Sequence, residues 1–141
     1  MDWKAMYAIP FKHALSTKLR YFQFKVLHNI LVVNKYLKLV GILNSDLCDF
    51  WLNDIESITH LFWDCPVTHQ LILKFQEHTL NNQIILSMNS FLFGISKGNF
   101  CHFNFVILYA KYYIFLQSLK MLDYRLNYLR NSWNIITTLN E

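Results

Sequence analysis

The chain has 141 residues, of which 54% are hydrophobic and 17% aromatic, while only three are glycine and two are proline. Such a composition excludes a disordered or low-complexity chain and favours one helix-rich domain with few tight turns. The net charge of +4 is segregated, because residues 1–40 and 81–140 are basic whereas residues 41–80 hold six acids against one lysine, a pattern typical either of solvated helix faces or of a surface that binds nucleic acid.

The first predicted element is an amphipathic basic helix over residues 17–29. Ser16 and Thr17 are suitable N-cap residues, and apolar residues recur after them at helical spacing. Lysines and an arginine tend toward the opposite face. His28 follows the apolar face, so we expect it to be a core residue and not a catalytic base. The apolar face comprises Leu19, Phe22, Val26 and Leu27.

A shorter helix and an irregular loop follow. The helix is expected over residues 34–40, with Asn34 as its cap, and Gly41 can adopt the left-handed conformation that ends a helix. Residues 42–59 have no sustained period, which predicts an irregular loop.

Two further segments precede the last third of the chain. Pro66 suits the first turn of a helix, and apolar residues at helical spacing extend that helix to Leu80. Residues 84–95 are compatible either with a strand or with a buried helical turn, because periodicity does not separate the two in so short a run.

The last third carries the strongest periodicity in the sequence. Apolar residues alternate spacings of three and four over residues 105–136. This heptad seam predicts a long helix, capped at Asn99 and packed along its length. We expect residues 105–119 to be core within the chain and the distal apolar residues to form a self-association or partner surface. The distal residues are Leu126, Leu129 and Trp133.

The segment between Cys48 and Cys65 resembles a zinc site that lacks one ligand. Zinc prefers four thiolate, imidazole or carboxylate ligands, and a C-x-x-C pair supplies two of them from one turn. Here Cys48, His60 and Cys65 supply three, while Trp51 stands where the second cysteine of the pair would be. Either a nearby carboxylate or a water completes the site, or the two cysteines are simply small buried side chains. The nearby carboxylates are Asp49 and Asp54.

Short segments spread along the chain resemble those of one protein family. The sequence HLFW-x-CP at residues 60–66 is the most specific of them, LHNIL at residues 27–31 is another, and similar residues resume at residues 107–114. These segments resemble the zinc-binding region that follows the polymerase in non-LTR (LINE-like) retrotransposon reverse transcriptases. The resemblance covers the chain to about residue 120.

The resemblance places the family's zinc ligands on Cys48, His60 and Cys65, with Trp51 at the fourth position. Because a structural site loses several kcal/mol with a missing thiolate, zinc binding is expected to be weak or lost. One nucleotide change converts a cysteine codon into a tryptophan codon. The chain is therefore expected to be a degenerate fragment, either the remnant of a mobile element or one put to a new use.

The resemblance also implies a non-catalytic module that grips RNA or DNA. The chain begins near the start of the family's region and contains no adjacent aspartates of the kind that bind polymerase magnesium, so no enzymatic activity is expected. The alternative is a folded interaction or self-association module without a nucleic-acid role. The basic residues expected to contact phosphates are Lys12, Lys18, Arg20, Lys25, Lys35 and Lys38, with Tyr21 or Trp3 available for base stacking.

These elements together predict a mainly α fold, a small helical domain with an irregular zinc-knuckle-like loop and a long C-terminal helix. Residues 1–98 are expected to form the zinc-binding-like module and residues 99–141 the amphipathic helical segment, in one compact unit. No signal peptide is visible, and the apolar stretches at residues 79–96 and 103–122 are interrupted by amides or lysines. We therefore expect an intracellular protein, nuclear or cytoplasmic, that is not secreted and has no membrane partner.

Overall fold

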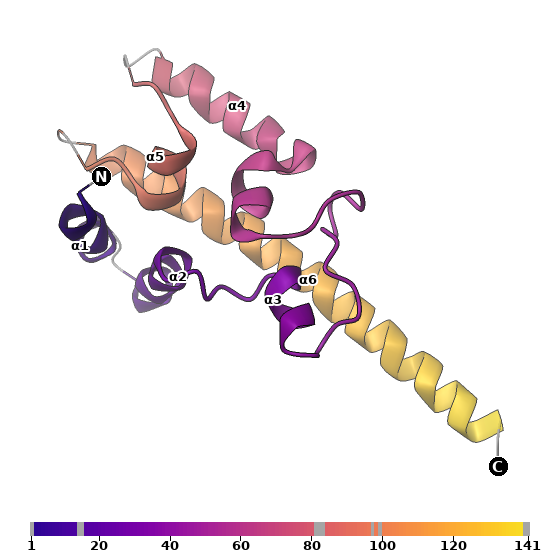
Figure 1. The fold of residues 1–141 in the computed structure, drawn as a ribbon. Helices are drawn as coiled ribbons and strands as arrows, with labels where there is room; N and C mark the ends of the chain where they lie inside the picture. Colours follow the sequence, from indigo (N-terminus) through magenta and orange to yellow (C-terminus); the bar gives the residue numbers. More distant parts are fainter. Residues whose placement is uncertain (1, 14–15, 81–83, 97, 99, 140–141) are drawn as a thin grey trace.

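The protein is built from helices arranged around one long C-terminal helix (Figure 1). The computed structural model describes residues 2–13, 16–80, 84–96, 98 and 100–139, and the side chains of residues 13, 78, 79 and 124–139 lie outside this description. No strand occurs in the described ranges, so the predicted mainly α fold with a long C-terminal helix is confirmed. The predicted boundary between residues 98 and 99 stays a prediction. The helices are α1 (Trp3–His13), α2 (Thr17–Leu27), α3 (Asn34–Leu39), the π-helical turn η1 (His60–Asp64), α4 (Pro66–Leu80), α5 (Met88–Phe93) and α6 (Cys101–Leu139).

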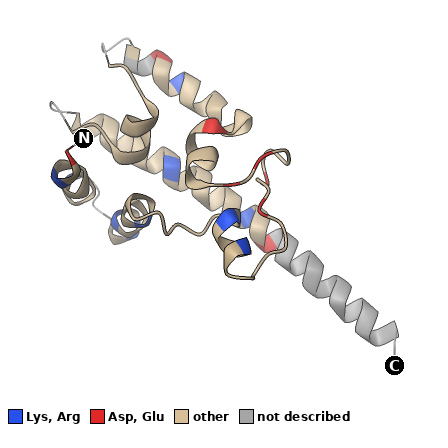
Figure 2. Cartoon of the chain, in the orientation of Figure 1, with Lys and Arg blue, Asp and Glu red and all other residues tan. Residues whose placement is uncertain are grey.

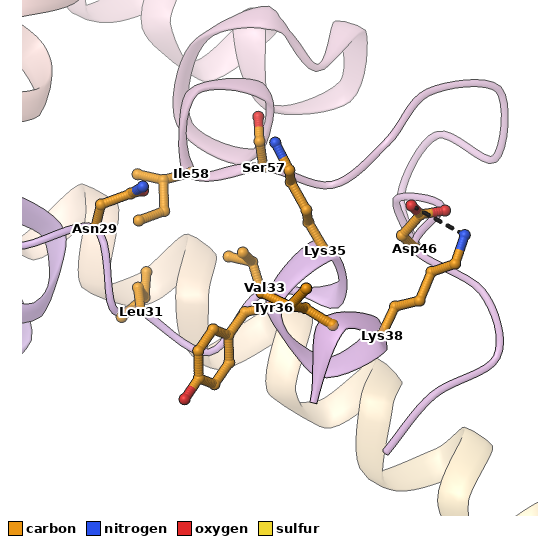
Figure 3. A pocket seen from close by; sticks show the side chains of 10 residues that line it. Asn29, Leu31, Val33, Lys35, Tyr36, Lys38, Asp46, Ser57 and Ile58 are labelled. Carbon is orange, nitrogen blue, oxygen red and sulfur yellow. Dashed lines mark ion pairs between the residues drawn. The ribbon is translucent and has the colours of Figure 1, made fainter. Parts of the chain in front are cut away.

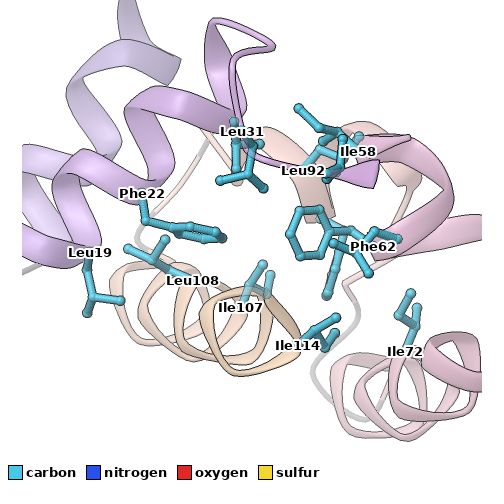
Figure 4. Close-up of a cluster of buried hydrophobic side chains, with 14 of the residues drawn as sticks. Leu19, Phe22, Leu31, Ile58, Phe62, Ile72, Leu92, Ile107, Leu108 and Ile114 are labelled. Atoms are coloured by element: carbon cyan, nitrogen blue, oxygen red, sulfur yellow. The ribbon is translucent and has the colours of Figure 1, made fainter. Parts of the chain in front are cut away.

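The core lies where α2, η1, α4 and α5 meet the N-terminal half of α6 (Figure 4). The long helix packs on α1, α2 and η1, and α5 packs on α2. Phe22 of α2 occupies the centre, because its ring lies 6.1 Å from that of Phe62 and 5.3 Å and 5.4 Å from those of Tyr112 and Phe115. Each such aromatic pair contributes about 0.5–1.5 kcal/mol beyond the area it buries. The apolar face predicted for residues 17–29 is therefore the face that α2 buries.

The buried face of α6 is rotated from the predicted seam. Leu108 is buried as expected, but the other described seam residues up to residue 119 are only partly buried. The centre of the face instead holds Asn104, Lys111 and Ser118, which are buried and spaced seven residues apart. The prediction that the whole seam up to residue 119 is core is therefore only partly right. The partly buried seam residues are Phe105, Tyr112, Phe115 and Leu119.

These polar residues of α6 are buried because polar groups of other elements meet them there. The Asn104 amide accepts a hydrogen bond from the Ile95 N–H at 2.7 Å and donates one to the Ile95 carbonyl at 2.9 Å. Lys111 Nζ donates to Gln23 Oε1 and to the Leu92 carbonyl, both at 2.6 Å. A polar side chain is buried without large cost only where such partners exist, and a pattern of apolar residues does not reveal them.

The helix α1 is an element that the sequence pattern did not predict. It packs on α2 and on α6. Its Ile9 comes close to the backbone of Gly94 beyond the end of α5, where an added Cβ would lie 3.0 Å from Ile9 Cδ1. Gly94 also has φ 94, a conformation that other residues rarely adopt, so glycine is required there on two grounds.

The predicted core position of His28 is wrong. The helix α2 ends at Leu27, and Asn29 just beyond it has the left-handed φ of 55. The imidazole therefore leaves the buried face and lies on the surface.

The start of α3 is tied to the loop that follows it. Asn34 is the first residue of α3 and not its cap, and its side chain donates to the Leu47 carbonyl at 2.8 Å and to Asp49 Oδ2 at 3.1 Å. Glu56 Oε1 accepts the Asn34 N–H at 3.0 Å, so a buried carboxylate stabilises this helix end. Gly41 has φ 81, which confirms the left-handed ending predicted for this helix.

The two segments before α6 are both helical. This confirms the predicted helix that starts at Pro66 and decides between helix and strand for residues 84–95. Pro66 begins α4, as expected. The ambiguous residues 84–95 contain the short helix α5, preceded by a reciprocal cap. Ser87 Oγ accepts the Ser90 N–H at 3.2 Å, and Ser90 Oγ accepts the Ser87 N–H at 2.7 Å. This capping pair selects the helix over a strand.

By length and composition alone, Cys101–Asp123 of α6 meets the criterion for a membrane span. Within the protein, 33% of the most apolar part of this stretch is buried, on the face that packs against the other helices. Core helices of globular proteins meet the same criterion, so these properties give no argument for a membrane.

Candidate metal centre and nucleic-acid interface

Three buried side chains converge beside η1. They are Cys48 in the loop, His60 at the start of η1 and Cys65 just before α4. Their ligand atoms all lie within 4.8 Å of one another, and the two Sγ atoms are 3.9 Å apart. Zinc–sulfur bonds of about 2.3 Å at a tetrahedral angle place two thiolate sulfurs roughly 3.8 Å apart. The structure therefore brings the three predicted ligands together, and the distance between the two sulfurs fits a zinc site.

Local backbone structure accounts for this convergence. An antiparallel bridge between Leu47 and Ile55 closes the loop, and the Cys48 N–H donates to the Asp54 carbonyl at 2.8 Å. The wide π-helical turn of η1 allows the Cys65 N–H to donate to the His60 carbonyl at 2.8 Å. This hydrogen bond holds Cys65, just beyond the end of η1, close to His60 at its start. The sequence did not predict this π-helical turn.

Burial acts against ionisation of Cys48, and His60 in the same cluster has a ring nitrogen without a partner among the described residues. Burial raises the pKa of the Cys48 thiol to about 12, and the backbone N–H groups of Trp51 and Phe50, which hydrogen-bond to it, act in the opposite direction. Within the described part of the chain, His60 Nε2 is buried without a hydrogen-bond partner. A buried ring nitrogen of this kind is costly unless a ligand occupies it. A zinc ion would use this nitrogen and the two thiolates, releasing protons as it binds.

The fourth position of the site is not filled by a predicted carboxylate. Among the described residues the cluster contains only Cys48, His60 and Cys65, so neither Asp49 nor Asp54 joins it. Asp49 accepts a hydrogen bond from the Asn34 side chain instead, and Asp54 is exposed. The indole of Trp51 is 38% exposed. A fourth ligand would therefore be a water or another small molecule.

The six predicted phosphate-binding residues fall on α1, α2 and α3 (Figure 2). Those of α3 lie near acidic residues of the following loop, and Lys38 forms an ion pair with Asp46 at 3.3 Å. Two cations of α2, Arg20 and Lys25, lie over aromatic rings instead. Lys12, Lys18, Lys35 and Lys38 are exposed, and Arg20 and Lys25 are partly buried.

Exposed rings form a row along α2 that sequence reasoning found only in part. We define the aromatic row as Tyr21, Phe24, His28 and Tyr7. The rings of Tyr21 and Phe24 are parallel within 4° with centroids 6.4 Å apart, and the Phe24 and His28 centroids are 4.1 Å apart. Tyr7 of α1 continues the row, 5.4 Å from His28. The spacing of three and four residues between Tyr21, Phe24 and His28 was the available signal, and of these three only Tyr21 was predicted to stack on bases.

Cations flank the aromatic row. Lys25 Nζ lies 4.6 Å from the centroid of the Tyr21 ring, and Arg20 Cζ lies 5.9 Å from that of Phe11. Phe11, Arg20, Tyr21 and Phe24 also line a shallow hollow of about 340 Å³. Tyr21 is 60% exposed and Phe11 is 67% exposed, so large rings form the surface around this hollow.

The match to a known protein family covers about half of the chain. Residues 2–71 match the family described as zinc-binding in reverse transcriptase. No curated protein and no solved structure matched the chain. The matched residues include the three candidate metal ligands and all of the aromatic row.

Proposed function

Residues 2–71 belong to the family of zinc-binding domains in reverse transcriptase, and from this premise we propose that the chain is a non-catalytic module that binds single-stranded nucleic acid. A domain of this family is an accessory zinc-binding unit and not the catalytic part of the enzyme. The proposal that the whole chain lacks catalytic activity extends this statement to the remaining residues. Neither the metal cluster nor the aromatic row combines a nucleophile, a base and an orienting acid.

The aromatic row with its flanking cations is the observation that carries this function. Bases of a single strand stack on exposed rings, and each stacked base contributes about 1–3 kcal/mol to binding. Lys18 and Lys25 of α2 provide charge for the phosphates between such bases. In duplex nucleic acid the bases are already stacked on one another, so this surface favours a single strand.

Zinc in this module would have a structural role and not a catalytic one. Cys48, His60 and Cys65 would hold it, and the ion would cross-link the loop to η1 and α4. With Trp51 in place of a fourth protein ligand, affinity is expected to be low, so the fold must rely mainly on its apolar core. The nucleic-acid surface lies on α1 and α2, away from these ligands in the sequence.

The origin and location of the chain follow from the same proposal. The replaced ligand supports descent from a LINE-like retrotransposon, as a remnant or a re-used fragment. A module that meets such nucleic acids works in the nucleus or the cytoplasm, where thiols stay reduced.

Removing the cations beside the aromatic row should weaken binding to single-stranded RNA. The affinity for a single strand falls with salt by a slope of about −0.7 per phosphate contact, so replacing Lys18, Arg20 and Lys25 with Ala should flatten the log–log slope by about 2. Fluorescence anisotropy of labelled RNA over a range of salt concentrations measures this slope. Lys74→Ala combined with Lys120→Ala, both exposed on other helices, should leave it nearly unchanged.

The contribution of stacking can be separated from that of charge. Tyr21→Ala should weaken binding by about 1–3 kcal/mol at every salt concentration without changing the slope. A triple variant whose slope equals that of the unmodified chain would contradict the proposed surface.

A separate observation favours a second function, which is self-association or binding of a protein partner. Tyr109, Tyr113 and Leu116 of α6 are 50%, 61% and 37% exposed and lie at helical spacing on one stripe. This stripe favours a self-association or partner surface on the described part of α6. The distal surface expected at Leu126, Leu129 and Trp133 lies outside the described side chains. Absence of RNA binding would leave this interaction role as the better proposal.

A further inference from the structure

A pocket of about 560 Å³ lies beside α3, between the segment that leads into this helix and the segment that leads into η1 (Figure 3). Its apolar wall is formed by Leu31, Val33 and Ile58, which are core residues. The volume falls in the range of sites that take small organic ligands. None of the residues of the metal cluster or of the aromatic row lines it.

The charged side of the pocket carries Lys35, for which the described residues provide no ion pair. Lys38 and Asp46 both line the pocket, but they neutralise each other in the ion pair at 3.3 Å. Lys35 extends toward Ser57 at the opposite side (Figure 3), and it has no ion pair among the described residues. A positive charge beside an apolar wall suits a ligand that has both a flat apolar part and an anionic group.

Asn29 supplies an amide group that can form hydrogen bonds with the edge of such a ligand. Its left-handed backbone conformation, φ 55, turns the chain between α2 and α3, and its side chain lies over the Leu31 and Ile58 end of the pocket (Figure 3). A primary amide both donates and accepts, which is how asparagine pairs with the edge of adenine. Asn29 directly follows His28, the member of the aromatic row that is nearest to the pocket in the sequence.

We propose that this pocket receives one unstacked nucleotide, with the base against Leu31, Val33 and Ile58 and the 5′-phosphate beside Lys35. The proposal deepens the nucleic-acid-binding function, on which it rests for the source of the nucleotide. A strand that stacks on the aromatic row would continue past His28 into the pocket. Single-strand readers commonly splay a base out of the strand in this way and bind its edge by hydrogen bonds.

The test uses the full chain and free nucleotides, so that the pocket is measured apart from the strand. Calorimetric titration with AMP should give affinity at least about tenfold higher than titration with ribose 5-phosphate, because the base adds apolar burial. Lys35→Ala should weaken AMP binding about fivefold or more, since it removes the phosphate partner. Lys74→Ala, an exposed lysine of α4 outside both the pocket and the strand-binding surface, should change AMP affinity less than about twofold.

The outcomes separate the pocket from the strand-binding surface. Equal affinity for AMP and ribose 5-phosphate would reduce the pocket to a phosphate contact and overturn the proposal, and so would AMP affinity that survives Lys35→Ala. A chain that binds single-stranded RNA but not AMP would also overturn the pocket, while the function proposed for the aromatic row would stand. A chain that binds AMP but not RNA would contradict strand binding on the aromatic row, while the pocket would stand as a site for a free nucleotide. Because Lys35 is exposed, unchanged circular dichroism of the variant serves as the folding control.

Discussion

Replacing Trp51 with cysteine should convert the three-ligand cluster into a four-ligand zinc centre. The turn at Cys48 already directs the backbone N–H groups of Phe50 and Trp51 at the Cys48 sulfur, as a thiolate ligand requires. A complete structural zinc site in a small peptide contributes about 10–16 kcal/mol, and part of that should appear here as folding free energy. With zinc present, we expect one bound ion per chain and a thermal midpoint raised by about 10 °C or more.

The result for Trp51→Cys is compared with that for the unmodified chain and for one control variant. The unmodified chain should retain much less than one zinc after dialysis, measured by atomic emission. Trp51→Ser removes the same partly exposed indole and adds no strong ligand, so its midpoint should not depend on zinc or on a chelator. Stoichiometric zinc in the unmodified chain would show that three protein ligands and a water suffice.

Replacing Lys111 with methionine should remove a pH dependence of stability. Burial lowers the pKa of Lys111 from 10.5 to about 7, although its ammonium donates to Gln23 Oε1 and the Leu92 carbonyl. Between these two pKa values the unfolded chain binds more protons than the folded chain, so stability rises with pH from about 7 and is lowest below it. Between pH 7 and 9 this lysine should add about 2 kcal/mol to the free energy of unfolding.

Urea unfolding of both chains between pH 6 and 9 measures the effect. Lys111→Met should be the more stable chain at pH 6, because the loss of one hydrogen bond to Gln23 costs about 1–3 kcal/mol and the buried charge costs more. The high pKa of Cys48 lowers stability only as the pH passes its ordinary value of 9.0, outside this window. Parallel stability curves for the two chains would contradict a charge penalty at Lys111.

The sequence predicted most closely the elements that regular apolar spacing or a proline in the first turn marks. Leu19, Phe22 and Val26 mark the buried face of α2, and Pro66 marks the start of α4. The buried face of α6 was misplaced because Asn104 and Lys111, at its centre, are polar and their partners come from other parts of the chain. Short-range pattern contains no information about such partners.

The candidate site, too, could be predicted from the sequence only in part. The residues Cys48, His60 and Cys65 were identifiable from ligand type, and the resemblance supported them, but their convergence depends on the Leu47–Ile55 bridge and the π-helical turn. The aromatic row was only partly visible, because the packing of α1 on α2 brings in Tyr7 from a helix that was not predicted.

The central claim is that a single strand stacks on the aromatic row, and photochemical cross-linking tests it most directly. The full chain is irradiated with bound single-stranded RNA, and cross-linked peptides are located by mass spectrometry. Cross-links should fall on residues 21–28 and on Tyr7, and excess unlabelled RNA should compete them away. Cross-links confined to α4 or to the acidic loop after α3, with none on the row, would contradict the claim.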